Sequence, residues 1–297
     1  MKVTKKNWWA PWLFLLLPLL MYIIWVIAPI LQTFAYSFLK WDGFSPISEM
    51  KFMGFGNYIR LFQTNAFWTS LGNNLWWLLL FAIIPVPLGL FIAMLFDTKL
   101  PGNKAYKTLL YLPMTLSFVV IGQIWNWIYA PDYGALTQLL EGIGLGGLVP
   151  ERGWISNPDI VTFMLIIAGV WRQLPYIMVI YLAGLKNVPP VLVEASVVDG
   201  ANWWQRFRHV ILPQLAPSTI VAVTVSVIES LRAFDIVYVM TRGGPSGASN
   251  TMANYMYIES FNNYRMGYGS SIAVIQFLIT FIFIMVYLSR VLKQERE

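Results

Sequence analysis

The sequence has 297 residues, of which 58% are hydrophobic, 16% are aromatic and only 11% are charged. Because soluble domains carry about 25% charged residues, this composition excludes an ordinary soluble protein and indicates several membrane-spanning helices. The chain has no cysteine and one histidine, which excludes disulfides and thiolate metal sites, and its net charge of +6 comes from residues scattered at the borders of apolar stretches, which indicates membrane orientation and not nucleic-acid binding.

Six apolar stretches are long enough to cross a bilayer, which takes about 20 residues per helix. They cover residues 12–39, 70–96, 109–130, 160–185, 214–240 and 269–290. The first stretch is too long for a signal-peptide core, so we expect a retained helix with Trp8, Trp9 and Trp12 at the membrane interface. The sequence therefore predicts an all-α membrane protein with six transmembrane helices.

The distribution of basic residues predicts the orientation. Six helices place both termini on one side, where the loops and ends carry twelve Lys and Arg, against six on the other side. Because cytoplasmic loops carry the excess of basic residues, we expect both termini, and the segment 186–213, in the cytoplasm. The outer loops are too short for a further domain, so we predict a single transmembrane domain over residues 1–297, with core helices at about 70–290.

The segment "EASVVDGANWWQRFRHVILP" (194–213) is a polar interruption between the fourth and fifth apolar stretches. Pro189 and Pro190 suit the first turn of a helix, and Gly200 suits a left-handed end. Asn202 followed by Gln205 is typical of an N-cap. We therefore expect two short helices joined by a sharp turn, neither of which can span the bilayer.

Apolar residues in this segment recur at helical spacing. Val193, Val197, Ala201 and Trp204 lie three or four positions apart and predict one apolar face. An exposed apolar face rimmed by charge is typical of a surface that docks a protein or lies against lipid, and the residues alone leave both possibilities open.

The chain lacks a phosphate-binding loop. The nearest candidate, "PGNKAYKT" (101–108), has Pro101 and Tyr106 where a Walker A motif needs glycine. We therefore expect no ATP hydrolysis by this chain. Two classes of transporter fit this absence, namely a permease with a separate ATPase subunit and an ion-coupled secondary transporter.

Polar and charged residues interrupt two of the predicted spans. They are Arg172, Gln173 and Tyr176 in the fourth, and Ser226, Glu229, Ser230, Arg232 and Asp235 in the fifth. Charged groups inside a membrane are costly and usually mark function. Arg232 lies three residues from each acid, so an internal salt-bridge cluster is one interpretation, and a polar path for a substrate is the other. In an ion-coupled carrier, Glu229 and Asp235 would hold the ion, although no internal repeat supports that class.

The segment 194–213 resembles the EAA loop of permease subunits in binding-protein-dependent ABC importers. That motif reads Glu-Ala-Ala, three residues, Gly, nine residues, Ile, one residue and Leu-Pro, and the chain departs from it at Ser196 and Val210 only. The resemblance implies that this loop docks into a cytoplasmic ATPase subunit. The coupling residues it implies are Glu194, Ala195, Ser196, Asp199, Gly200, Arg206, Leu212 and Pro213.

Further segments resemble carbohydrate importers, in particular the first permease subunit of maltose-type transporters. They are "PILQTFAYSF" (29–38), "GFGNYIRLF" (54–62), "FDIVYVMTRGGPSGASNT" (234–251) and "YGSSIAVIQF" (268–277). The resemblance implies a type I importer permease fold in a prokaryotic inner membrane. It also implies partners, namely a second permease, two ATPase subunits that bind ATP and magnesium, and an extracytoplasmic sugar-binding protein.

The same resemblance implies a substrate path for a sugar or oligosaccharide, formed by the helix just before the coupling loop and the helix just after it. Matching "WRQLPY" (171–176) and the residues before "TRGGP" places it at Arg172, Gln173, Tyr176, Ser226, Glu229, Ser230 and Ala233. Arg172 and Arg232 would suit a carboxylate or phosphate, which leaves an acidic saccharide open as the substrate. The sugar passes through unmodified in this family, so no catalytic residue is expected in this chain.

Overall fold

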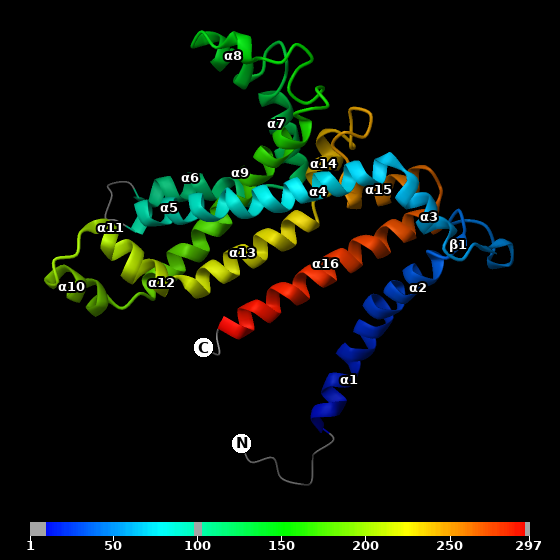
Figure 1. Ribbon diagram of the computed structural model, residues 1–297, viewed down its shortest axis with the longest axis horizontal. Coiled ribbons are helices and arrows are strands. Elements are labelled where there is room, and N and C mark those ends of the chain that lie inside the picture. Colours follow the sequence, from blue (N-terminus) through cyan, green and yellow to red (C-terminus); the bar gives the residue numbers. More distant parts are fainter. Residues whose placement is uncertain (1–9, 98–102, 295–297) are drawn as a thin grey trace. The chain divides into compact units, whose positions relative to one another are not determined.

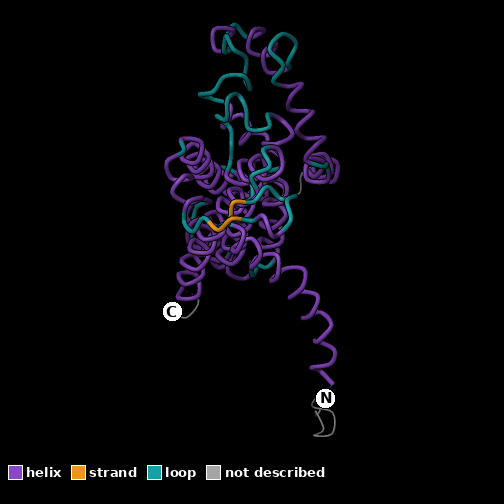
Figure 2. Tube along the Cα trace, turned by 90° about the vertical axis from the view of Figure 1, so that its right-hand side faces the viewer, coloured by secondary structure: helices purple, strands orange, loops and turns teal. Residues whose placement is uncertain are grey.

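The computed structural model describes residues 10–97 and 103–294, so the expected interface residues Trp8 and Trp9 lie outside the described part. Figure 2 shows that this part consists of helices and loops, with one two-stranded hairpin. The chain divides into two compact units. The first comprises Met1–Asn65 with Tyr255–Ile284, and the second comprises Ala66–Asn254 with Met285–Glu297.

The first unit begins with an almost continuous apolar helix. It consists of α1 (Ala10–Tyr22), a π-helical turn (Ile23–Ile27) and α2 (Ala28–Tyr36). A hairpin of β1 (Leu39–Lys40) and β2 (Lys51–Phe52) follows, and then α3 (Gly56–Gln63). The buried Asn57 amide donates to the Ser37 and Leu39 carbonyls at 2.8 and 2.9 Å, and it thereby ties α3 to the end of α2. The unit also holds the first part of α16 (Met266–Gln294).

The second unit contains most of the helices (Figure 1). In chain order they are α4 (Asn65–Ile83), α5 (Pro85–Asp97), α6 (Asn103–Thr115), α7 (Phe118–Ile128), α8 (Ala135–Gly142), α9 (Val161–Lys186), α10 (Pro190–Val198), α11 (Trp203–Arg206), a π-helical turn (Phe207–Ile211), α12 (Leu212–Gln214), α13 (Ala216–Leu231), α14 (Asp235–Met240) and α15 (Met252–Tyr257). The long α9 is the centre of the unit, and α5, α6 and α13 pack against it.

The structure confirms an all-α membrane protein. Among the described residues, four helices are long and apolar enough to span a membrane, over Trp12–Tyr36, Asn65–Asp97, Val161–Lys186 and Met266–Tyr287. Two further pairs qualify only if each bent pair counts as one span, which brings the number to six. These pairs are α6 with α7, bent by 104°, and the run 203–214 with α13, bent by 69°.

The fifth predicted span is not one continuous helix. We expected a helix over 214–240, but α13 ends at Leu231 and α14 starts at Asp235. Ala233, one of the predicted path residues, therefore lies in the break and not on a face of α13. No proline or glycine marks residues 232–234 in the sequence, so the break carries no local signal.

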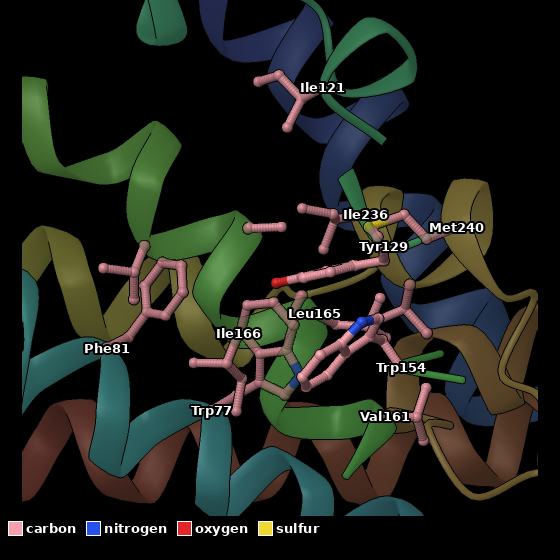
Figure 3. Packing of buried hydrophobic residues seen from close by; sticks show 14 residues of the cluster. Trp77, Phe81, Ile121, Tyr129, Trp154, Val161, Leu165, Ile166, Ile236 and Met240 are labelled. Carbon is pink, nitrogen blue, oxygen red and sulfur yellow. The ribbon is translucent and has the colours of Figure 1, made fainter. Parts of the chain in front are cut away.

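Aromatic and aliphatic side chains from α4, α7, α9 and α14 form the largest buried cluster of the second unit (Figure 3). Trp77, Tyr129 and Leu165 lie at its centre, and the Tyr129 hydroxyl donates to the Met164 carbonyl at 3.1 Å. Lipid tails are as apolar as these side chains, so close packing stabilises such an interface more than burial does. A Cβ on Gly169 would come within 2.9 Å of the Trp77 ring, so glycine is required for this approach of α4 to α9.

Candidate functional site

A cavity of about 210 Å³ lies in the second unit, beside the break between α13 and α14. Its lining comes from α4, α7, α9, the end of α13, the start of α14 and the break between them. The lining residues are Trp77, Phe81, Phe118, Gly169, Arg172, Gln173, Glu229, Arg232, Ala233, Phe234, Asp235 and Ile236. The cavity therefore brings together five of the eight residues that the sequence assigned to a substrate path.

Several polar groups of the cavity wall lack a hydrogen-bond partner among the residues that the structure describes. The Nε of Arg172, the Nε2 of Gln173 and the indole Nε1 of Trp77 are buried donors without an acceptor. The Arg172 guanidinium lies over the Phe118 ring, 3.9 Å from its centroid, which holds the cation in place by a cation–π contact. Because buried donors in native proteins are almost always satisfied, this wall is suited to a ligand or water that supplies oxygen acceptors.

The predicted salt-bridge cluster around Arg232 is wrong. In the part of the chain that the structure describes, no ion pair joins Arg232 or Arg172 to Glu229 or Asp235 within 4.0 Å. The physical reason is the end of α13 at Leu231, because a spacing of three residues places side chains on one face only within a continuous helix. Neither arginine is therefore paired with either acid at this distance.

Three predicted path residues do not line the cavity. Ser226 and Ser230 are fully buried within α13, and the Ser230 hydroxyl donates to the Val227 carbonyl at 2.7 Å. Tyr176 is 41% exposed on α9. Sequence reasoning also missed the aromatic wall of Trp77, Phe118 and Phe234, because aromatic residues are frequent in every predicted span and nothing local distinguishes these three.

A larger cavity of about 400 Å³ lies in the first unit. It is lined by the hairpin, α3 and the region before α16, and includes Lys40, Asp42, Arg60 and Tyr264. The Ser45 hydroxyl, with two backbone amides, donates to Asp42 and lowers the pKa of this carboxyl to about 2, so that it stays ionised. Carboxylates and cations are mixed in this wall, and it contains none of the predicted path residues, so the smaller cavity remains the candidate path.

The segment 186–213, the predicted coupling segment, forms the two short helices and the sharp turn that its sequence predicted. Pro189 precedes α10, and Gly200 follows it with a φ of +77°, the left-handed conformation expected at the end of a helix. The Ala201 amide donates to the Ser196 carbonyl at 2.9 Å, which completes the turn. Asn202 and Gln205 form a reciprocal capping box, with both hydrogen bonds at 2.9 Å. The two short helices and the sharp turn are thus confirmed.

The exposed surface of this segment is apolar with a carboxylate. Glu194 and Ala195 are exposed on α10, and Val198 is 87% exposed. The predicted single apolar face is wrong in part, because Val193 and Ala201 are half-buried while Val197 and Trp204 are exposed. The exposed apolar residues are Val191, Leu192, Val197, Val198, Trp203 and Trp204.

The other predicted coupling residues have distinct environments. Ser196 is buried and its hydroxyl donates to the Val193 carbonyl at 2.7 Å, so this hydroxyl is satisfied within α10. Asp199 and Pro213 are exposed, whereas Arg206 is half-buried. Leu212 and Pro213 form α12 directly after a π-helical turn, which agrees with proline being unable to donate in a regular helix.

Arg172, which lines the cavity, and Lys186, where the segment 186–213 begins, both belong to α9. Arg172 precedes the end of α9 at Lys186 by 14 residues, which corresponds to about 21 Å along a helix that rises 1.5 Å per residue. Figure 1 shows α10 and α11 at one end of the second unit, beyond that end of α9. The cavity and the segment 186–213 are thus joined by one helix, which contains Pro175 between Arg172 and Lys186.

Residues 85–296 match a family described as binding-protein-dependent transport system inner membrane component. The chain is 38% identical to a probable ABC transporter permease protein of Pyrococcus horikoshii, over 93% of both chains. It is 32% identical to the trehalose/maltose transport system permease protein of Thermococcus litoralis, over 92% of this chain and 91% of the relative. Its fold matches a chain in a solved structure of a bacterial alginate ABC transporter in complex with an alginate pentasaccharide-bound periplasmic protein, with a TM-score of 0.80, 19% identity and coverage of 94% and 92%.

Proposed function

The chain belongs to the family of binding-protein-dependent transport system inner membrane components, and from this premise we propose that it is the permease subunit of an importer for a sugar or oligosaccharide. It is accordingly a multi-pass inner-membrane protein. The observation that carries the proposal is the similarity to a trehalose/maltose transport system permease protein over 92% of this chain, supported by a cavity that contains five of the eight predicted path residues. None of the relatives named above is an ion-coupled carrier.

ATP hydrolysis takes place in partner subunits, and the segment 186–213 couples this chain to them. Two ATPase subunits bind ATP and magnesium, and a second permease completes the membrane part. An exposed apolar surface that carries a carboxylate is suited to docking in a groove of another protein, and α10 offers Glu194 beside exposed valines. In this proposal both termini and the segment 186–213 are cytoplasmic, and residues 1–297 act as one transmembrane domain.

The outer loops receive a sugar-loaded binding protein. Closure of the ATPase pair moves α10, the cavity opens outward, and hydrolysis returns it to the inward-facing state. A sugar hydroxyl or carboxylate accepts hydrogen bonds from the unpartnered donors of Arg172 and Gln173, while Phe118 and Trp77 provide apolar walls. Arg232 offers a second planar cation, which supports an acidic saccharide as one substrate class.

The test is purification of this chain from its native membrane in mild detergent, with identification of the proteins that copurify. We expect a nucleotide-binding subunit and a second permease. Saccharides are then added one at a time with the binding protein, and the substrate is the one that stimulates ATP hydrolysis. A chain that purifies alone and transports in liposomes without ATP would contradict the proposal.

A further inference from the structure

The outer loop after α14, residues 241–252, is folded compactly on itself. The Thr241 and Ser249 hydroxyls lie 2.8 Å apart, and Ser249 donates to the Gly244 carbonyl at 2.6 Å. Arg242 and Ser246 are exposed at the tip and both have a positive φ, of 53° and 51°. The tip is therefore accessible to a partner, and the loop behind it is internally braced.

Two asparagines of α4 hold the base of this loop. The Asn73 amide donates to the carbonyls of Ala248 and Asn250 at 2.7 and 2.8 Å, while its oxygen accepts from the Thr162 hydroxyl at 3.1 Å. The oxygen of Asn74 accepts the Met252 amide at 2.7 Å. Both asparagines are buried, so these bonds are shielded from water and define one position for the loop.

The base of the loop also binds the wall of the cavity. Thr251 is fully buried, and its hydroxyl donates to the Ala233 carbonyl at 2.6 Å. Ala233 lies in the break between α13 and α14 and lines the cavity. In a membrane, a carbonyl released by a helix break needs another donor, and Thr251 is that donor.

We propose that the loop 241–252 is a strut that sets the shape of the substrate cavity, with Thr251 as the positioning residue that joins the two. A contact on the exposed tip shifts the braced loop as a unit, and the Thr251 hydrogen bond carries that shift to the break that bears Arg232, Ala233 and Asp235. This mechanism rests on the proposed function in one respect, namely that an outer partner docks on the tip. The coupling itself is a property of this chain.

The test compares Thr251→Val with Thr251→Ser in the assembled transporter in lipid nanodiscs. Valine has nearly the shape of threonine but no hydroxyl, whereas serine retains the donor. We expect Thr251→Val to reduce the ATPase activity stimulated by sugar-loaded binding protein about tenfold, which is typical of a lost coupling between sites. Thr251→Ser retains wild-type stimulation.

Hydrogen exchange of the same samples provides a readout that does not depend on transport. Peptides covering 228–240 exchange about tenfold faster in Thr251→Val than in the wild type, because the break loses its donor, while peptides of α5 are unchanged. Asn73→Ala is a second variant, which releases the loop from α4 and leaves the Thr251 hydroxyl in place. We expect Asn73→Ala to show the same loss of stimulated ATPase activity. The double variant Asn73→Ala/Thr251→Val loses no more stimulation than either single variant, because both substitutions act through one strut.

Two results would contradict the proposed strut. One is a hydrogen-exchange rate at 228–240 in Thr251→Val equal to that of the wild type, and the other is equal stimulation of ATPase activity in the valine and serine variants. If the wild type shows no stimulation by any binding protein while exchange still rises in the valine variant, the proposed function fails and the coupling within the chain stands. If Thr251→Val does not assemble, the exchange and stimulation of Asn73→Ala decide.

Discussion

At the residue scale, Arg172 is the best-defined polar group of the cavity, because Phe118 fixes its guanidinium and no carboxylate of the described residues forms an ion pair with it. We predict that Arg172→Gln lowers sugar uptake about tenfold or more, since a hydrogen bond to a charged group contributes about 1.5–3 kcal/mol. Uptake of labelled sugar into proteoliposomes is the measurement. Tyr176→Phe is the matched control, because Tyr176 lies on the same helix and does not line the cavity. Equal losses of sugar uptake in both variants would show that the substrate path includes Tyr176, as the resemblance implies, and is not confined to the residues that line the cavity.

Glu194 makes a second prediction at this scale. It is exposed on α10 and has no ion-pair partner among the described residues, so Glu194→Ala should leave insertion and folding of the chain unchanged. We expect association with the ATPase subunit to weaken about tenfold, the loss typical of an interface residue that contributes more than about 1 kcal/mol. Copurification at graded salt concentrations measures this. Glu141→Ala, on the exposed part of α8, is the control, and an ATPase complex of normal stability in Glu194→Ala would exclude Glu194 from the coupling surface.

At the element scale, the close approach of α4 and α9 depends on Gly169. A methyl group there would meet the Trp77 and Phe81 rings at 2.9 and 3.0 Å, so we predict that Gly169→Ala destabilises the second unit by about 1–3 kcal/mol, the usual cost of overpacking. The thermal unfolding temperature in detergent should fall by roughly 2–4 °C per kcal/mol. At Gly72, also on α4, a methyl group meets nothing within 4 Å, so Gly72→Ala should not lower it. A Gly169→Ala protein as stable as Gly72→Ala would show that the helices can separate without cost.

The elements also differ in how far the sequence could predict them. The turn at Gly200 and the capping box of Asn202 and Gln205 follow from residues within a few positions of each other, so their patterns were sufficient. The Ala233 carbonyl in the break after Leu231 accepts a hydrogen bond from Thr251, which is 18 residues further along the chain. Periodicity within a window cannot detect a donor that arrives from another segment, so a continuous span was expected there.

At the scale of the whole molecule, we propose that the chain provides a path and a coupling surface, while energy enters through a partner. We predict that uptake by the reconstituted complex requires ATP inside the vesicle and is unaffected when ionophores collapse proton and sodium gradients. A secondary transporter would behave in the opposite way, because its driving force is the ion gradient. Uptake assays with a non-hydrolysable ATP analogue and with ionophores distinguish the two, and uptake that is lost with ionophores alone would move Glu229 and Asp235 to the centre of the mechanism.

The sequence by itself determined the membrane class, the approximate position of the apolar stretches and the two short helices of the coupling segment. These features follow from composition and from neighbouring residues, which act through short-range hydrogen bonds and backbone preferences. The tertiary structure decided which polar residues share a cavity, that Arg232 forms no ion pair with Glu229 or Asp235, and that Asn73 and Thr251 join an outer loop to the cavity wall. The physical reason is that these contacts join residues far apart in the chain, and only the packing of α4, α9, α13 and α14 brings their side chains within hydrogen-bonding distance.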